Sequence, residues 1–398
     1  MRRLYLSLLG IVLSLLSATG HPMDSVEVSL LTCAPGTEIW SQYGHTAVRW
    51  HDKQRGGTDV AINYGVFSFD APHFVVRFIL GLTDYELGVI PYDVFRAQYQ
   101  EYEKREVYEQ VLDLDNEDKE TIFRALQDNL RPENGVYRYN YFYDNCTSRA
   151  RDLIITHLRH TVAYPPMQAS DNLSYRELLH ACNGNTPWTQ VGEDILLGLK
   201  ADRPTTQAQR QFLPAHLQAD FDRTTYQGKP LVKETRKVVS VAGGDVSDPS
   251  PVFSLFACAL VFLLLSVVVW AIEWRRKQIF WGWDLLLMVL AGCIGLLLTL
   301  MVFSQHPCVS LNLLILVFNP LPLLMAYRAT RRTMRQQADP WWTIWAIMIV
   351  FGLFGRVFQY YPPAVVVVAL ILLCNSAIHP LLQRRRMVGV ARKLRENG

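Results

Sequence analysis

The sequence predicts an α+β exported domain followed by an all-α transmembrane domain of five helices. The charge distribution is one reason: residues 251–398 contain 14 Lys and Arg against 4 Asp and Glu, whereas residues 1–250 contain 25 against 32. The other reason is that five long apolar runs follow one another after residue 250. This pattern excludes a purely soluble enzyme and a disordered chain. It also argues against a nucleic-acid partner, because the basic residues lie between apolar runs and not on a folded basic face.

The first 20 residues predict a secretory signal peptide. Arg2 and Arg3 precede an apolar stretch, and the small residues Ser17, Ala18 and Gly20 follow it. An uncleaved anchor helix is the alternative, although the apolar run is short for a membrane span. We therefore expect the chain from residue 21 onward to begin outside the cytoplasm.

Residues 21–235 predict the exported α+β domain. Alternating apolar residues indicate strands, and apolar residues at intervals of three and four indicate helices. The expected strands are 26–33, 43–50, 60–67 and 136–143, and the expected helices are 116–130 and 146–160. Residues 236–250 are rich in Gly, Ser and Pro and predict a linker.

Residues 251–380 predict the membrane domain, and residues 381–398 a basic cytoplasmic tail. Each apolar run approaches the ~20 residues needed to cross a bilayer, and the fourth is marginal. The runs are 252–272, 280–303, 311–327, 341–358 and 362–379. Basic residues in the successive loops and the tail number 3, 0, 4, 1 and 6. The positive-inside rule therefore places the C-terminus in the cytoplasm and the N-terminal domain outside it.

Cys146 is the candidate nucleophile. It follows Asn145 at an expected helix start, where unpaired backbone N–H groups favour the thiolate. His45 lies in an expected strand, and a hairpin that pairs Ala47 with Asn63 places Asn63 diagonally beside it. Cys, His and Asn together can activate a thiol. The alternatives are an inert or disulfide-bonded Cys146, a packed His45, and an ordinary strand residue at Asn63, which a one-residue slip would turn to the other face.

Three further cysteines are expected to be exported. Disulfides can form there, so a bridge between Cys33 and Cys182 would leave Cys146 free, whereas one between Cys33 and Cys146 would remove the nucleophile. Cys308 adds further pairings, and the sequence does not choose among them.

Other polar residues are candidates for substrate binding. They are Tyr43 and Asn145 near the two motifs, and His306 and Asn312 near an exported loop, where ordinary interfacial polarity is the alternative. The sequence contains no nucleotide-binding or zinc-binding motif, so we expect neither a cofactor nor a metal.

The order of these motifs resembles known families. His45 followed by an Asn-Cys pair at 145–146 resembles the permuted NlpC/P60 (papain-like) thiol fold and the lecithin:retinol acyltransferase family. More segments resemble the Lnb-type lipoprotein N-acyltransferases. They are VSLLTCAPGTEIWSQYGHTAVRW (28–50), INYGVFSFD (62–70), YNYFYDNCTSRARDL (139–153), PWTQVGEDILLGL (187–199) and SQHP (304–307).

This resemblance implies acyl transfer at the outer leaflet of the inner membrane. A phospholipid would donate the acyl chain to Cys146, and the free α-amino group of a diacylated lipoprotein would accept it, with His45 as base. Five spans fit a lipid substrate, because exposing a 16-carbon chain to water costs about 12 kcal/mol. The alternatives are a membrane-tethered cysteine hydrolase of cell-wall peptides or lipid esters, and a non-enzymatic envelope scaffold.

Overall fold

The computed structural model describes residues 23–54, 57–67, 72–183, 186–241 and 254–396. Its contacts divide the chain into two compact units: an N-terminal unit of residues 1–182 and 204–246, and a helical unit of residues 183–203 and 247–398. The predicted signal peptide and residues 242–250 of the predicted linker lie outside the described residues. We describe each unit by itself.

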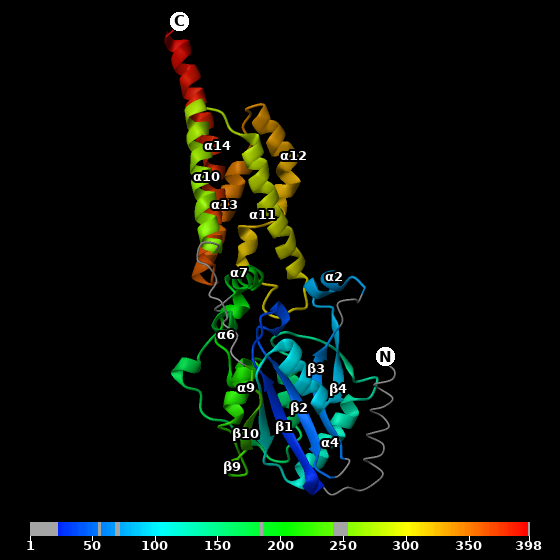
Figure 1. The fold of residues 1–398 in the computed structure, drawn as a ribbon. Helices are drawn as coiled ribbons and strands as arrows, with labels where there is room; N and C mark the ends of the chain where they lie inside the picture. The colour runs from blue at the N-terminus through cyan, green and yellow to red at the C-terminus, as the bar shows by residue number, and fades with distance from the viewer. Residues whose placement is uncertain (1–22, 55–56, 68–71, 184–185, 242–253, 397–398) are drawn as a thin grey trace. The chain divides into compact units, whose positions relative to one another are not determined.

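The N-terminal unit is built on one large antiparallel sheet. Among the described residues, seven strands form it in the order β10-β5-β1-β2-β3-β4-β6 (Figure 1). They are β1 (Val26–Cys33), β2 (His45–Asp52), β3 (Asp59–Val66), β4 (Asp84–Pro91), β5 (Val107–Leu112), β6 (Val136–Arg138) and β10 (Val232–Val239). A small second sheet contains β7 (Val162–Ala163), β8 (Thr225–Tyr226) and β9 (Lys229–Pro230).

Apolar side chains cover both faces of the large sheet. On one face, a core that includes Leu30, Val48 and Ile62 also takes in residues of three helices, which are α4 (Asn116–Asn129), α5 (Cys146–Ile155) and α9 (Pro214–Phe221). On the other face, Leu31 and Ala47 pack with side chains of α3 (Tyr92–Ala97) and the π-helix Gln98–Glu103. Shorter helices are α2 (Phe74–Ile79), α6 (Tyr175–Cys182) and α8 (Gln207–Arg210).

The α+β class of this unit is confirmed, whereas the NlpC/P60 permutation stays a prediction. Several expected boundaries differ; the helix expected over 146–160, for example, ends at Ile155. The strand expected over 136–143 ends at Arg138, because the chain then turns and Asn140 bridges Asp144. At the other end, β10 continues to Val239, past the expected linker boundary at 235, because it pairs with β5.

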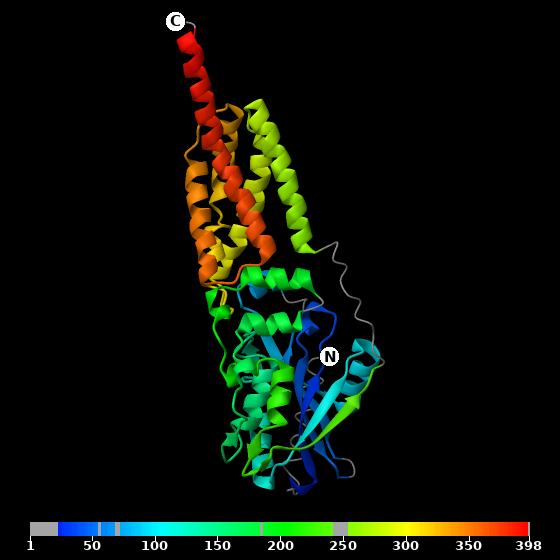
Figure 2. The same cartoon turned by 90° about the vertical axis from the view of Figure 1, so that its left-hand side faces the viewer.

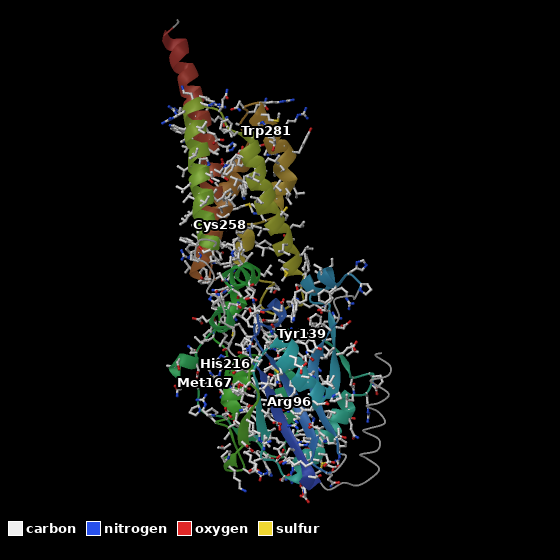
Figure 3. The ribbon with its side chains drawn as sticks, viewed as in Figure 1. Arg96, Tyr139, Met167, His216, Cys258 and Trp281 are labelled. Carbon is white, nitrogen blue, oxygen red and sulfur yellow. The ribbon has the colours of Figure 1, made fainter. Side chains whose placement is uncertain are left out.

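The helical unit contains the apolar helices as one bundle (Figure 2). They are α10 (Leu255–Arg276), α11 (Trp281–Val302), α12 (Leu321–Met334), α13 (Trp341–Phe354) and α14 (Pro363–Glu396). Cys258 and Trp281, near the first residues of α10 and α11, lie at opposite ends of the bundle (Figure 3). By length and composition, four segments of the described chain can cross a membrane. The fourth apolar run forms a shorter helix, so the predicted count of five spans is not confirmed.

Residues 183–203 belong to the helical unit, although the sequence places them within the exported domain. They form α7 (Pro187–Leu196) and a short 3₁₀ helix, Leu199–Asp202. The backbone N–H of Gly198 donates to the Cys308 carbonyl at 2.7 Å, and that of Leu199 donates to the Leu311 carbonyl at 2.8 Å. A side chain at Gly198 would meet the Leu311 oxygen at 2.1 Å, so only glycine permits this close approach.

A buried polar cluster lies inside the bundle, and sequence inspection did not single it out. The His379 imidazole pairs with the Asp284 carboxylate at 3.0 Å and stacks on Trp342 at 3.8 Å between ring centroids. Asn375 donates to Asp284 at 2.9 Å and accepts from the Trp270 indole at 3.0 Å. These contacts join α10, α11, α13 and α14 and satisfy polar groups that a bilayer could not.

Candidate active site

Cys146 is the first residue of α5, and the residue before it explains why the helix begins there. The Asn145 side-chain oxygen accepts from the backbone N–H groups of Thr147 and Ser148, at 3.0 and 2.9 Å, while the Ser148 hydroxyl accepts from the Asn145 N–H. This is a capping box, which fixes the helix start. Cys146 therefore lies in the first turn, where the helix dipole favours a negative charge.

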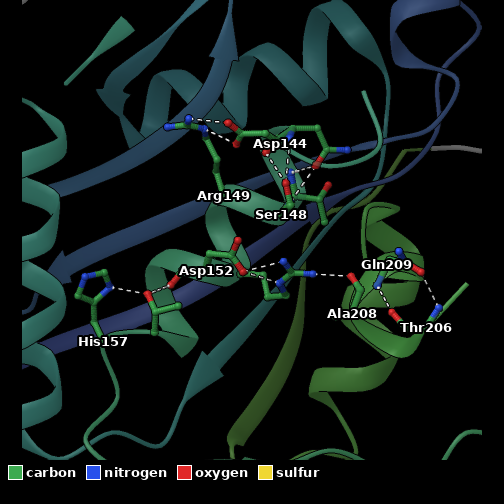
Figure 4. A network of polar contacts seen from close by, with 12 residues as sticks. Asp144, Ser148, Arg149, Asp152, His157, Thr206, Ala208 and Gln209 are labelled. Atoms are coloured by element: carbon green, nitrogen blue, oxygen red, sulfur yellow. Dashed lines mark hydrogen bonds and ion pairs between the residues drawn. The ribbon is translucent and has the colours of Figure 1, made fainter. Parts of the chain in front are cut away.

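Side-chain contacts of α5 hold this turn in place (Figure 4). Arg149 forms an ion pair with Asp144 at 2.6 Å, just before the helix, and its guanidinium lies 3.4 Å from the centre of the Tyr137 ring. Two residues later, Arg151 donates to the Ala208 carbonyl at 2.6 Å. An ion pair to the residues before the helix and a hydrogen bond to α8 thus hold the turn that carries Cys146 in position.

His45 and Asn63 come from the neighbouring strands β2 and β3. Ala47 pairs with Asn63, which confirms the predicted hairpin register. His45 Nε2 lies 3.1 Å from the Asn63 side-chain oxygen, so the amide can orient the imidazole. Continued regularly, this register would pair His45 with Gly65, but Gly65 falls beyond the last regular pair, at a shift in register.

Gly65 brings β3 close to the helix start. Its φ is +89°, a left-handed conformation that other residues adopt only with strain. A Cβ at this position would lie 3.7 Å from the Cβ of Cys146 and 3.6 Å from the Tyr139 ring. The sheet and α5 therefore meet at the candidate nucleophile.

Cys146 and His45 change each other's ionisation. Burial raises the pKa of the Cys146 thiol, but the charge of His45, a hydrogen bond from His45, and hydrogen bonds from the Thr46 N–H and Thr147 outweigh it and lower the pKa to about 7. Burial lowers the pKa of His45, but the charge of Cys146 and hydrogen bonds with Cys146 and Asn63 raise it overall. The pair thus favours thiolate with imidazolium near neutral pH.

Cys33 lies directly opposite His45 in the β1–β2 pair but has different chemistry. It is buried in the core beneath the sheet, and this burial raises the pKa of its thiol to about 12 despite a hydrogen bond with Tyr99. Among the described residues Cys33 forms no disulfide. The Cys33–Cys182 bridge, one of the pairings that the sequence leaves open, is therefore not formed in the structure. Cys146 also carries a free thiol.

The proposed substrate-binding residues fall in both units. Tyr43, just before β2, contacts Tyr141 edge to face, with 5.6 Å between ring centroids. The buried Asn145 uses its amide nitrogen on the Tyr141 and Phe212 carbonyls, so its side chain is occupied in holding α5. The polar atoms of the Asn145 side chain all form hydrogen bonds within the protein, so they are not available to a substrate. Substrate binding by Tyr43 stays a prediction.

His306 and Asn312 belong to the helical unit. The backbone N–H of His306 donates to the Ser304 hydroxyl at 3.2 Å, in the turn after α11. Asn312 is buried, donates to the Ile195 carbonyl at 2.7 Å and accepts from Gln359 at 2.8 Å. Its amide therefore holds residues 183–203 against the bundle.

Thr46 and Thr147 contact the candidate nucleophile, and sequence analysis did not identify them. Each directly follows a predicted site residue, which is the one signal that could have found them.

No group of three or more His, Cys, Asp or Glu side chains in the described part of the chain could hold a metal ion.

Comparison with known proteins matches both parts of the chain to one family. Residues 20–181 match the family model of the Lnb N-terminal periplasmic domain, and residues 247–386 match that of the Lnb transmembrane domain. Together the two matches span more than half of the 398 residues. No curated protein and no solved structure matches the chain.

Proposed function

The chain belongs to the Lnb-type lipoprotein N-acyltransferase family, and on this premise we propose that it transfers an acyl chain from a phospholipid to the N-terminal amine of a lipoprotein, through a thioester on Cys146. The observation that carries the proposal is the arrangement of three side chains. A thiol with a pKa of about 7 at a helix start is hydrogen-bonded to an imidazole, which an amide orients at 3.1 Å. This is the geometry that covalent thiol catalysis requires.

In the first half-reaction, the Cys146 thiolate attacks the carbonyl carbon of a phospholipid ester. The carbon–oxygen bond of the ester then breaks, and the departing alkoxide takes a proton from the His45 imidazolium. The products are a Cys146 thioester and a lysophospholipid. Because the Thr147 and Ser148 N–H groups already donate to Asn145, we assign the backbone N–H of Cys146 as the helix-start donor for the oxyanion of the tetrahedral intermediate.

In the second half-reaction, the α-amino group of the lipidated N-terminal cysteine of a lipoprotein attacks the thioester. Neutral His45 takes a proton from this amine, an amide bond forms, and Cys146 leaves as the thiolate. The resting pair is restored, because the imidazole again carries a proton and the sulfur a negative charge. Asn63 keeps the imidazole oriented throughout both steps.

The helical unit supports a lipid substrate. Withdrawing a 16-carbon acyl chain into water would cost about 12 kcal/mol, so an enzyme that moves such chains gains from a membrane-embedded domain. We also propose that the inner membrane holds this domain with the C-terminus in the cytoplasm and the N-terminal unit in the periplasm. The basic residues at the C-terminal ends of α10 and α12 and in the C-terminal part of α14 support that orientation.

The test uses the full chain in phospholipid vesicles with a diacylated lipopeptide that has a free α-amine. Mass spectrometry should detect an N-acylated lipopeptide and an equal amount of lysophospholipid. We expect Cys146→Ser and His45→Ala to abolish both products, and Cys258→Ser, on an exposed position of α10, to leave them unchanged. Acylated lipopeptide formed by Cys146→Ser would refute the thioester route. Release of free fatty acid in place of acylated lipopeptide would instead support the hydrolase alternative.

A further inference from the structure

Two buried hydroxyl groups link β2 to the sulfur of Cys146. Thr46 Oγ1 donates to Thr147 Oγ1 at 3.1 Å, and Thr147 Oγ1 lies 3.8 Å from Cys146 Sγ, within hydrogen-bonding range for sulfur. Both threonines are fully buried, each with 0% of its surface exposed. Water therefore cannot replace either hydroxyl at this position.

The direction of these hydrogen bonds follows from the chemistry of the groups. A thiolate has no hydrogen and can only accept, so the bond between Thr147 and ionised Cys146 must run from the hydroxyl to the sulfur. A threonine hydroxyl has one hydrogen to donate. Because the Thr147 oxygen already accepts from Thr46, its own hydrogen is left to point at Cys146.

Thr46 contributes to the same sulfur a second time. Its backbone N–H also donates to Cys146, so one residue of β2 provides a direct donor and orients a second one. Thr46 directly follows His45, the third group that contacts the sulfur. The start of β2 thus surrounds the thiolate with donors.

We propose that Thr46 and Thr147 form a hydroxyl relay that donates a hydrogen bond to the Cys146 thiolate, making Thr147 a catalytic residue and the Thr46 hydroxyl a positioning group. This inference rests on Cys146 being the nucleophile of the proposed function. The relay stabilises the ionised sulfur before acyl transfer and the departing thiolate after it. Its hydroxyls do not titrate, so they support the thiolate at any pH at which it forms.

The other titratable groups around Cys146 are neutral near pH 7, so the relay and His45 are the side chains that stabilise its thiolate. Tyr137 and Tyr139 face Cys146 from the segment before α5, and burial raises the pKa of both phenols, so they stay neutral near pH 7. The thiol of Cys33, on β1, is neutral for the same reason. Of these groups, His45 is the one whose charge lowers the pKa of Cys146.

The test measures the pH dependence of Cys146 alkylation by iodoacetamide in the full chain. The other cysteines are replaced by serine or alanine, so that alkylation reports on Cys146 alone, and this readout does not depend on acyl transfer. We expect Thr147→Val to raise the midpoint by about half to one pH unit and to slow alkylation at pH 7 about two- to five-fold. Thr147→Ser should restore the original midpoint, because it keeps the hydroxyl.

A double-mutant comparison separates the relay from general packing. Thr46→Val should raise the midpoint by less than Thr147→Val, and adding it to Thr147→Val should produce no further shift, because the relay is already interrupted. Thr156→Val, at the exposed end of α5, is the matched control and should leave the midpoint unchanged.

If Thr147→Val leaves the midpoint unchanged while the separate variant His45→Ala raises it, the relay is overturned and the proposed function still stands. Equal, additive shifts from the two valine variants would also overturn it, because they would indicate independent packing effects. If neither His45→Ala nor Thr147→Val changes the midpoint, the nucleophile assignment of the proposed function fails as well.

Discussion

Replacing His45 with alanine removes the strongest influence that lowers the pKa of Cys146. In the intact protein this pKa is about 7, against an ordinary 9.0. A difference of two units corresponds to about 3 kcal/mol in favour of the thiolate, or about half of the thiol ionised at pH 7 against about 1%. Burial, which raises the pKa of Cys146, would remain in the variant. We therefore expect a pKa of about 9 or higher and about 50-fold slower alkylation at pH 7.

The assay follows iodoacetamide alkylation of Cys146 from pH 6 to pH 10 by mass spectrometry of the peptide that contains it. The size of the effect depends on pH. Because the intact pKa is lowered, the difference between the two proteins should be largest below pH 8 and should shrink above pH 9, where both thiols ionise. His51→Ala is a matched control, because His51 lies on the same strand, near Asp59 at 3.9 Å. It should keep the midpoint near 7.

One result would refute this reasoning. If His45→Ala alkylates with a midpoint near 7, the imidazole does not stabilise the thiolate, and the helix start with its donors must account for the ionisation alone. Circular dichroism of the variant should show an intact fold, so that loss of structure is not mistaken for a change in pKa.

Four further variants and measurements test other parts of the structure. Asn63→Ala should slow acyl transfer several-fold without abolishing it, because the imidazole loses its orienting amide, and an unchanged initial rate would remove Asn63 from the site. Gly65→Ala should lower stability by about 1–3 kcal/mol, because it places a side chain at a φ of +89°, and an unchanged thermal midpoint would contradict that strain. Gln359→Leu should destabilise the helical unit by about 1–3 kcal/mol, because it leaves the Leu313 N–H, which donates to Gln359 at 2.8 Å, without its acceptor; thermal unfolding in detergent would show this. A reporter enzyme that works only in the cytoplasm should be active when it is fused after residue 398. Activity of a reporter that works only in the periplasm, fused at the same place, would reverse the proposed orientation.

Several features could be predicted from the sequence because neighbouring residues determine them. The Asn145 side chain caps the N–H groups of Thr147 and Ser148, so the start of a helix at Cys146 depends on a span of four residues. The β2–β3 hairpin pairs residues across a short turn, so counting from that turn gives the pairing of Ala47 with Asn63. The apolar runs identify membrane spans by length alone, although the fourth run is too short for length to decide.

The tertiary structure decided what depends on residues far apart in the chain. Thr46 and Thr147 are 101 residues apart, and only the packing of α5 against β2 brings them together and places His45 beside Cys146. The ionisation of Cys146 and of Cys33 follows from their tertiary surroundings: a charged neighbour lowers the pKa of Cys146, whereas enclosure in the core raises that of Cys33. Residues 183–203 likewise join the helical unit through hydrogen bonds to residues more than 100 positions away. The sequence by itself thus determined the local elements and the candidate residues, because adjacent side chains and backbone groups decide these. The fold determined which of them meet and in which state of ionisation, because distance and solvent exclusion are properties of the packed chain.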